Sequence, residues 1–361
     1  MKNKIIQGNC YEILKTLQSE SVNCCVTSSP YWGLRDYDTL PVYWPAITFC
    51  PMVELPAITI PAMESCHGME PNIFTYIAHE VLIFREVKRV LRADGTLWIN
   101  LGDGSVHNGA AYGNDKSTLT GRKHGKYMGK AKRFVKKVKG LPAKNVIGIP
   151  WRVAFALQAD GWILRREIIW SKPNPLPEAV KDACSKSHEY IFHFSKSKTY
   201  YYDADSIAEP YKANTLATHG AISRQMKKES TEMVKTNKWH NNSTIREPKK
   251  WPHPIMGGSG NGIRNFKIID GEGKANKKTV WTVPVNGFKG AHFATFPEKL
   301  IVPCILAGCP PEGLVLDPFG GAGTTALVSR KLNRNYLLIE LNKQYIAIAK
   351  QRLRDEIPLF M

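Results

Sequence analysis

The sequence predicts an α/β fold with an open, mostly parallel sheet and helices on both of its faces. Amphipathic helices precede apolar strands at two places, 76–92 before 96–101 and 152–158 before 162–170. Near the C-terminus an apolar strand, 313–317, enters a glycine loop that opens a helix and leads to a second strand, 336–339. Alternation of this kind is typical of parallel sheets whose strands are joined by helices.

The N-terminal elements follow the same plan. A short strand at 4–6 precedes a helix at 11–17, in which Tyr11, Leu14 and Leu17 share one face. A buried strand at 22–26 then runs into a polar turn, residues 27–32. The carboxyl ends of parallel strands line the ligand crevice of open sheets, so we expect this turn to lie at a site.

A proline-rich apolar insert, residues 39–69, follows the turn. It shows no clear period, but Trp44, Phe49, Ile58 and Ile60 are too apolar for a solvated linker. We therefore expect an ordered loop packed on the body. No function is assigned to it.

Gly95 is expected to form a turn between the helix at 76–92 and the strand at 96–101. After that strand, residues 104–140 form a basic loop with ten Lys or Arg and one acid, Asp115. Such a segment is suited to phosphate groups. The predicted DNA-binding residues are Arg122, Lys123, Lys126, Lys130, Lys132, Arg133, Lys136 and Lys137.

A further strand at 188–194 carries His188 and His193. Five residues apart on a strand, their side chains point to opposite faces, and no Cys-x-x-Cys pair occurs among the eight cysteines. We expect no metal site. Residues 204–279 are polar, glycine-rich and basic, and are the best candidate for a separate DNA-reading module.

The formal net charge is +19, which favours a polyanionic partner, and nucleic acid is the plainest one. We find no apolar run long enough to cross a membrane and no signal peptide. The expected protein is soluble, cytoplasmic and associated with the nucleoid, without a membrane partner.

The turn itself reads Ser28-Ser29-Pro30-Tyr31-Trp32. The Ser28 hydroxyl and the Ser29 carbonyl can accept hydrogen bonds from the exocyclic amine of a base. These bonds would draw its delocalised lone pair toward an electrophilic methyl group. Tyr31 can stack on an extruded base, and Trp32 can cover the other side of the ring.

These residues resemble motif IV of the β-group DNA amino-methyltransferases, in which serine at the first position usually goes with N4-cytosine and Asp or Asn with N6-adenine. Ser29 departs from the family, which usually has proline there, so we expect lost rigidity rather than lost function. Asn9 departs too, because the family usually has Asp in a Gly-Asp-Cys opening; Asn9 keeps an acceptor and loses the charge.

The C-terminal loop is similar to motif I of the same family, which binds S-adenosylmethionine. Glu340 resembles the motif II acid that takes the ribose hydroxyls, and the segment 292–300 resembles motif X. By this resemblance the cofactor-binding residues are Asn9, Cys10, Phe296, Asp317, Phe319, Gly320, Gly321, Gly323, Thr324, Thr325 and Glu340.

The resemblance implies a Rossmann-like class I methyltransferase with a seven-stranded sheet and a circularly permuted motif order. Residues 1–203, with the inserts 39–69 and 104–140, form the catalytic part. Residues 204–279 form the target-recognition region, and 280–361 the cofactor-binding part. Double-stranded DNA is the expected partner. A companion restriction endonuclease is a possible second partner. The oligomeric state, monomer or homodimer, stays open.

The expected reaction is transfer of a methyl group from S-adenosylmethionine to N4 of cytosine in duplex DNA, by base flipping and direct transfer. Four alternatives stay open: an N6-adenine enzyme, an RNA or protein methyltransferase, a DNA-binding protein without activity, and a nicotinamide enzyme. The last is raised by Gly321-x-Gly323-x-x-Ala326, which also fits the dinucleotide fingerprint. The position of this fingerprint near the C-terminus argues against that reading.

Overall fold

The computed structural model describes residues 2–33, 40–106, 136–175, 177–178, 181–210, 274–285 and 296–356. The chain forms two compact units, Met1–Ser206 with Lys278–Met361 and Ile207–Lys277. The bounds of the second unit lie close to those of the predicted target-recognition region. Its residues 211–273 lie outside the described ranges, and within the rest β10 (Glu209–Pro210) pairs antiparallel with β11 (Lys274–Ala275).

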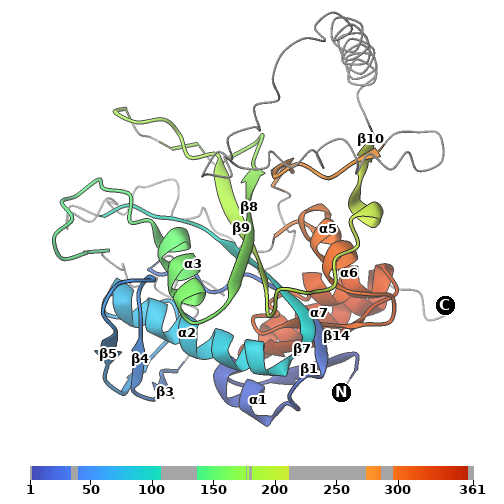
Figure 1. The fold of residues 1–361 in the computed structure, drawn as a ribbon, viewed down its shortest axis with the longest axis horizontal. Helices are drawn as coiled ribbons and strands as arrows, with labels where there is room; N and C mark the ends of the chain where they lie inside the picture. The colour runs from blue at the N-terminus through green and yellow to red at the C-terminus, as the bar shows by residue number, and fades with distance from the viewer. Residues whose placement is uncertain are drawn as a thin grey trace, which may run out of the picture. The chain divides into compact units, whose positions relative to one another are not determined.

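The first unit is built on a central sheet (Figure 1). In spatial order its strands are β1 (Lys4–Gln7), β14 (Asn335–Glu340), β13 (Leu314–Asp317), β2 (Val22–Thr27), β7 (Leu91–Leu101), β9 (His188–Ser195), β8 (Ile163–Ser171) and β12 (Val280–Thr282). Neighbouring strands are parallel except where β9 lies antiparallel to β7 and β8. The mostly parallel α/β sheet is confirmed, as the sequence pattern required.

The sheet has eight strands in the described residues, where seven were predicted. The additional strand is β12, which pairs with the carboxyl end of β8 from Val280 to Thr282. Three residues are too few to show a period of two, so the sequence pattern did not reveal this edge strand.

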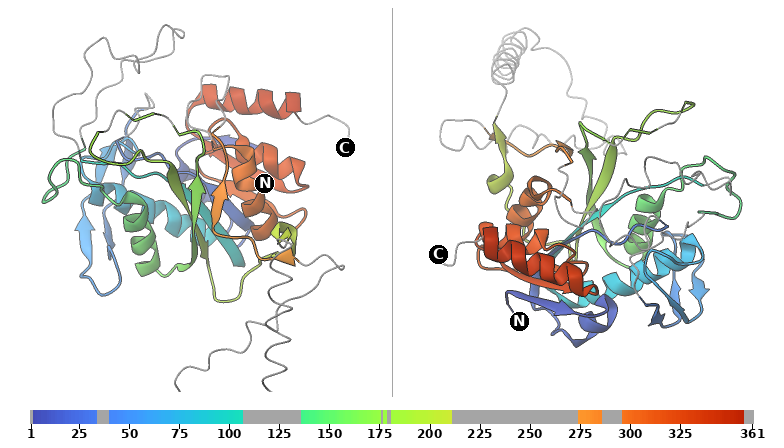
Figure 2. Two further views of the ribbon diagram at one scale, coloured as in Figure 1. Left: turned by 90° about the horizontal axis from the view of Figure 1, so that it is seen from above. Right: turned by 180° about the vertical axis from the view of Figure 1, so that it is seen from behind.

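Two layers of helices cover the sheet (Figure 2). One layer contains α1 (Cys10–Thr16), α2 (Ile73–Val90) and α3 (Ile149–Ala159), and the other contains α5 (Glu298–Gly308), α6 (Thr324–Lys331) and α7 (Lys343–Glu356). A single short 3-10 helix, η1, spans Asp205–Ile207 among the described residues. Helices on both faces are therefore confirmed. Within the described ranges, no helix is both long and apolar enough to span a membrane.

The apolar insert is ordered over residues 40–69 and packs on α2. It contains two small antiparallel pairs, β3 (Val42–Trp44) with β6 (Met63–Ser65) and β4 (Ile47–Phe49) with β5 (Ile58–Ile60). Trp44 and Phe49 are buried, as the composition predicted. The strands were not predicted, because each has only three residues.

The predicted turn at Gly95 is wrong, because Gly95 lies inside β7. Val22 of β2 pairs with Leu91, while Cys24, only two residues later, pairs with Thr96. The residues of β7 between these two pairs form an irregularity in the ladder. β7 begins at Leu91, directly after α2, so no separate turn is needed at Gly95.

Candidate functional site

The two distant ends of the chain meet in the middle of the sheet. β2 and β13 are neighbours, with Cys24 opposite Val315 and Cys25 opposite Leu316. At their carboxyl ends the buried Thr27 hydroxyl donates to Oδ1 of Asp317 over 2.7 Å. The turn that follows β2 and the loop that follows β13 therefore start side by side.

A cavity of about 850 Å³ lies at these strand ends. Most of the residues that the sequence singled out for the catalytic turn and for the cofactor line this one cavity. They are Asn9, Cys10, Ser28, Ser29, Pro30, Tyr31, Phe296, Asp317, Phe319, Gly320, Gly321, Thr324 and Glu340. Residues of the catalytic turn and of the proposed cofactor site thus share one cavity, and its volume is sufficient for two reactants at once.

The loop after β13 is fixed by the Asp317 carboxylate. Oδ1 accepts a hydrogen bond from the backbone of Phe319 at 3.0 Å, and Oδ2 accepts one from the Thr325 hydroxyl at 2.6 Å. Burial raises the pKa of Asp317, although the hydrogen bonds from Thr27, Thr325 and Phe319 oppose this shift. The main task of this carboxylate is therefore to shape the loop.

Two predicted cofactor residues, Gly323 and Thr325, support the loop and do not line the cavity. Gly323 has φ of 79° and precedes α6, and a Cβ there would lie 2.7 Å from Cβ of Ala349. Thr325 is fully buried and turned toward Asp317. In the structure these two residues shape the loop that lines the cavity.

Glu340 ends β14 and lines the cavity. Its Oε2 accepts a hydrogen bond from the Gly321 amide at 2.7 Å, and its Oε1 accepts one from the Asn342 amide at 2.7 Å. Burial raises the pKa of this carboxyl, which both amides oppose. Each carboxylate oxygen has more than one acceptor position, so both can still receive a ligand hydroxyl.

Tyr31 is held by two polar residues that also line the cavity. Its hydroxyl lies 2.7 Å from Oε2 of Glu189 and 3.1 Å from Oδ1 of Asn100. Glu189 forms an ion pair with Lys172, and a Cβ on Gly102 would lie 2.4 Å from the Tyr31 ring. The ring is therefore fixed both at its polar end and along its edge.

Sequence reasoning missed Asn100, Lys172 and Glu189 as site residues, although all three line the cavity. Each lies where a predicted strand meets this edge of the sheet: Asn100 and Lys172 at carboxyl ends, and Glu189 at the start of the antiparallel β9. Polar residues at the ends of predicted strands were the sequence signal that could have identified these three residues.

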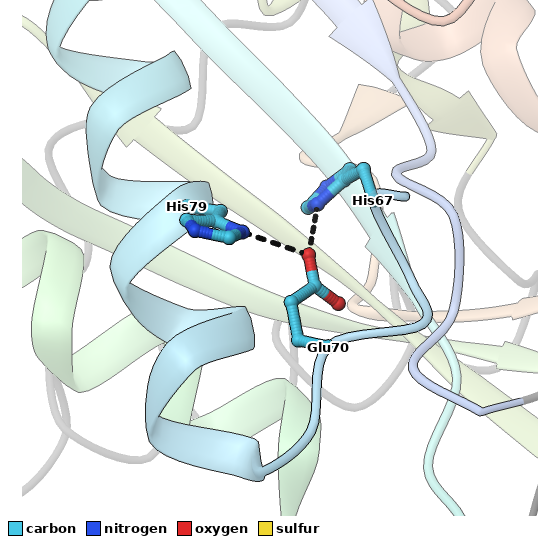
Figure 3. A group of neighbouring side chains, drawn as sticks. All are labelled: His67, Glu70 and His79. Carbon is cyan, nitrogen blue, oxygen red and sulfur yellow. Dashed lines mark hydrogen bonds and ion pairs between the residues drawn. The ribbon is translucent and has the colours of Figure 1, made fainter. Parts of the chain in front are cut away.

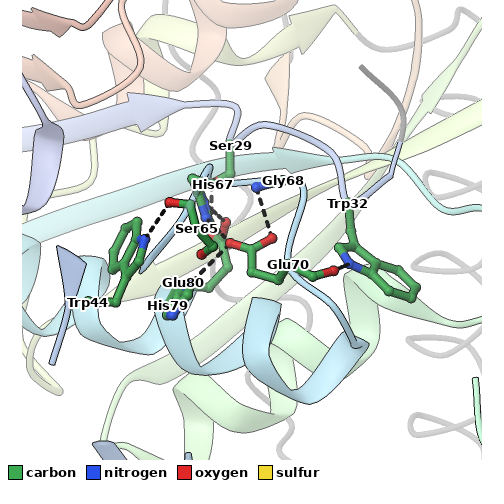
Figure 4. Close-up of polar contacts among 9 residues, drawn as sticks. All are labelled: Ser29, Trp32, Trp44, Ser65, His67, Gly68, Glu70, His79 and Glu80. Carbon is green, nitrogen blue, oxygen red and sulfur yellow. Dashed lines mark hydrogen bonds and ion pairs between the residues drawn. The ribbon is translucent and has the colours of Figure 1, made fainter. Parts of the chain in front are cut away.

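The predicted role of Trp32 in covering the base is not supported. Its side chain is fully buried, its indole N–H donates to the carbonyl of Glu70 at 2.9 Å, and it does not line the cavity (Figure 4). The Trp32 side chain belongs to the hydrophobic core instead. Through its burial and its bond to Glu70, Trp32 fixes the end of the turn.

Among the predicted DNA-binding residues, Arg122, Lys123, Lys126, Lys130, Lys132 and Arg133 lie outside the described residues. Lys137 is exposed, as expected for a phosphate contact. Lys136 is not, since its side chain lies against Gly104 and is only 6% exposed. Burial lowers the pKa of Lys136 to about 8, against the attraction of Asp103. The prediction for this lysine is wrong in the structure described.

Comparison with known proteins agrees with this arrangement. A family model of N6 and N4 methyltransferases, described as DNA methylase, matches residues 22–351. Type II methyltransferase M.SmaI of Serratia marcescens is 37% identical over 97% of this chain and 90% of its own length.

Two solved structures show the same fold. The PvuII DNA methyltransferase (cytosine-N4-specific) covers 100% of this chain and 88% of its own, with a TM-score of 0.56 at 16% identity. TTHA0409 of Thermus thermophilus, complexed with S-adenosyl-L-methionine, covers 99% and 96%, with a TM-score of 0.53 at 19% identity.

The cavity fits the cofactor that this family uses. Gly320 and Gly321 line it without side chains, and the Glu340 carboxylate provides acceptors of the kind that a ribose diol needs. The match to the DNA methylase model over most of the chain also excludes the nicotinamide reading of the glycine loop. The chain belongs to the N6/N4 family of DNA methyltransferases, with S-adenosylmethionine as its cofactor.

Proposed function

We propose that this enzyme methylates the exocyclic N4 of cytosine in duplex DNA, after turning the base out of the helix. The observation that carries the proposal is the shared cavity: Ser28 and Tyr31 line it together with the Gly320–Gly321 loop and Glu340. Serine at position 28 is the form of the catalytic motif that usually accompanies N4-cytosine in the family. This residue supports cytosine over adenine.

The chemistry follows from what the side chains offer. S-adenosylmethionine supplies an electrophilic methyl group. The Ser28 hydroxyl and the Ser29 carbonyl accept hydrogen bonds from the target amine, and Tyr31 stacks on the ring. Direct transfer needs no covalent intermediate, and the methylated nitrogen loses its proton to water. Positioning two reactants in this way can contribute about 7 to 11 kcal/mol.

The charge of the chain supports duplex DNA as the substrate. The net charge of +19 and the basic loop at 104–140 suit a phosphate backbone, and residues 204–279 are the proposed target-recognition region. M.SmaI is a type II methyltransferase, and on this ground we propose that the chain protects a site against a companion restriction endonuclease.

Mass spectrometry of nucleosides from DNA treated with the enzyme tests the proposal. We expect N4-methylcytosine. N6-methyladenine alone would establish the alternative, in which the same cavity holds the larger base. Competition between duplex DNA and RNA of the same sequence provides the second arm, and preferential methylation of RNA would contradict the duplex-DNA proposal. Sequencing DNA modified in a methylation-free host then reports the target site.

A further inference from the structure

A buried polar cluster lies directly beneath the catalytic turn. It consists of His67, Glu70, His79 and Glu80, joined to the Ser29 hydroxyl (Figure 4). His67 and Glu70 lie between β6 and α2, while His79 and Glu80 are on α2 itself. The side chains of both acids are fully buried. No step of the proposed reaction uses any of these four residues.

The hydrogen bonds form a continuous chain in which the two carboxylates are the acceptors. Glu70 Oε1 lies 2.8 Å from Nδ1 of His67 and 3.0 Å from Nδ1 of His79 (Figure 3). The other nitrogen of His67, Nε2, lies 2.7 Å from Oε1 of Glu80. The second oxygen of Glu80 accepts a hydrogen bond from the Ser29 hydroxyl at 2.8 Å. Ser29 is thereby tied to Glu80, and through it to His67.

His67 is an imidazolium in this setting, because both of its nitrogens face carboxylate oxygens. Burial alone would lower the pKa of His67, but the Glu70 and Glu80 carboxylates outweigh it and raise the pKa to about 10. Charge-assisted hydrogen bonds of this kind are stronger than neutral ones. The cluster is therefore a rigid support.

The same imidazole also touches the cofactor side of the site. Its ring stacks on Phe319 of the glycine loop, with centroids 5.6 Å apart, and on Tyr76 of α2, at 5.4 Å. His79 stacks on Trp44 of the apolar insert, at 4.1 Å. The cluster thus connects the catalytic turn, the cofactor loop and the insert.

Position 29 carries serine where the family motif that this turn resembles usually has proline. Proline fixes φ near −65° and removes conformational freedom from a turn, and serine does neither. Here the serine side chain is 2% exposed and bonded to a fully buried carboxylate. A side-chain hydrogen bond therefore replaces the constraint that the ring would have given.

We propose that Glu80 and His67 are positioning residues for methyl transfer: they hold Ser29 by its hydroxyl, and so keep its main-chain carbonyl beside the cofactor loop. The inference deepens the proposed function and rests on it. It also gives the apolar insert a role, since the insert contains His67 and packs Trp44 on His79 of the cluster.

A metal centre is the rival reading, because ligand atoms of His67, Glu70 and His79 lie within 4.8 Å of one another. The two Nδ1 atoms already share one Glu70 oxygen at hydrogen-bond distance, and the second Glu70 oxygen accepts from the Gly68 amide at 2.9 Å. Protons on the imidazoles account for all of these contacts. The hydrogen-bonded reading is the one that we adopt.

Single-turnover methyl transfer in Ser29→Ala, Glu80→Gln and the double variant tests the proposal. We expect each single change to slow transfer about tenfold while the affinity for S-adenosylmethionine stays within about twofold. The double variant should be no slower than the slower single variant, because both changes break one interaction. A wild-type rate in Ser29→Ala, or effects that multiply in the double variant, would overturn the proposal.

Ser29→Pro provides rescue and guards against a folding defect. Proline restores the constraint, so Ser29→Pro should transfer the methyl group faster than Ser29→Ala, and adding Glu80→Gln should then cost little. A tenfold loss from Glu80→Gln in the Ser29→Pro background would contradict the positioning role. Ser195→Ala is the matched control, since it removes another buried hydroxyl bond, 2.9 Å to the Ser197 carbonyl, away from the cavity. It should lower the melting temperature without slowing transfer.

Two further readouts separate the outcomes. Treatment with a chelator should leave the transfer rate unchanged, and a loss that added zinc reverses would establish the metal reading instead. DNA that carries no methyl mark with the wild-type enzyme would remove the proposed function itself. If the wild-type enzyme methylates DNA but the Ser29 and Glu80 variants transfer at the wild-type rate, only the positioning role is refuted.

Discussion

The two halves of the cavity are built in different ways. The cofactor half is mostly local: Asp317 takes hydrogen bonds from Phe319 and Thr325, and Glu340 takes one from Gly321. Thr27 is the distant donor in this half, with its hydroxyl bonded to Asp317. The catalytic turn, residues 28–32, is held from a distance, with Ser29 tied to Glu80 and Tyr31 to Glu189. One half is shaped mainly by its own short sequence, and the other mainly by side chains from the rest of the domain.

The comparison predicts that damage to the turn affects the transfer step, whereas damage to the loop affects cofactor binding. Ser28→Ala should show this most strongly. We expect a loss of about 10² to 10³ in the single-turnover rate, because an acceptor for the target amine disappears. Affinity for S-adenosylmethionine, measured by calorimetry, should stay within about twofold. Equal losses in rate and affinity would break the comparison.

Glu340→Ala is the reciprocal test in the cofactor half. It removes a buried acceptor and leaves the Gly321 and Asn342 amides without their partner. We expect cofactor affinity to fall about 10- to 100-fold, while the rate at saturating cofactor changes little. Glu20→Ala removes an exposed acid far from the cavity and serves as the control. An unchanged affinity in Glu340→Ala would refute the assignment.

Tyr31→Phe sharpens the comparison on the catalytic side. The ring remains, but its hydrogen bonds to Glu189 and Asn100 are lost. We expect a decrease of about three- to tenfold in the transfer rate, measured at saturating cofactor, because the stacking surface persists and only its anchoring weakens. Tyr31→Ala should be considerably slower. Equal rates in the two variants would show that the hydroxyl, and not the ring, is what matters.

The smallest effect concerns stability and pH. His67 has its pKa raised to about 10, so its contribution is complete below pH 6.5 and is lost as the pH rises through 10. Burial would raise the pKa of Glu70, but His67 and His79 lower it to about 2. The contribution of Glu70 is therefore complete above pH 4.5 and is lost as the pH falls toward 2. Both statements describe one ion pair, whose effect is largest between pH 4.5 and 6.5.

His67→Gln should accordingly lower the melting temperature by about 5 °C near pH 6 and by less near pH 10. Calorimetric scans across this range measure the difference from wild type. His193→Gln is the control, because burial lowers the pKa of His193 to about 3 and its charge does not change between these pH values. A difference for His67→Gln that stays constant with pH would contradict the ion pair.

The sequence was sufficient to predict most of the sheet and the glycine loop that lines the cavity, for one physical reason. Apolar period, glycine loop and strand-end acid all lie within 313–340, so local rules describe them. The support of the catalytic turn could not be found in this way. Glu80 reads as one of several charged residues on an amphipathic helix, and only the folded chain shows that it is fully buried.

The ligand contacts predicted for Trp32 and Lys136 also depended on local sequence alone, and here local sequence was misleading. An aromatic residue beside a catalytic turn and a lysine in a basic run both suggest ligand contacts. Their burial depends on where the chain turns next, which short-range pattern does not encode. Asn100 and Glu189, by contrast, could have been proposed from their positions at the ends of predicted strands.

The pairing of β2 with β13 has a consequence for biosynthesis. Thr27 and Asp317 are 290 residues apart, yet their bond lies at the centre of the sheet. The ribosome must deliver all residues from β2 through β13 before these strands can meet, and such distant pairing is slow to form. A half-made chain therefore holds an apolar strand with one edge unpaired, and nascent molecules should depend on chaperones until synthesis reaches residue 317.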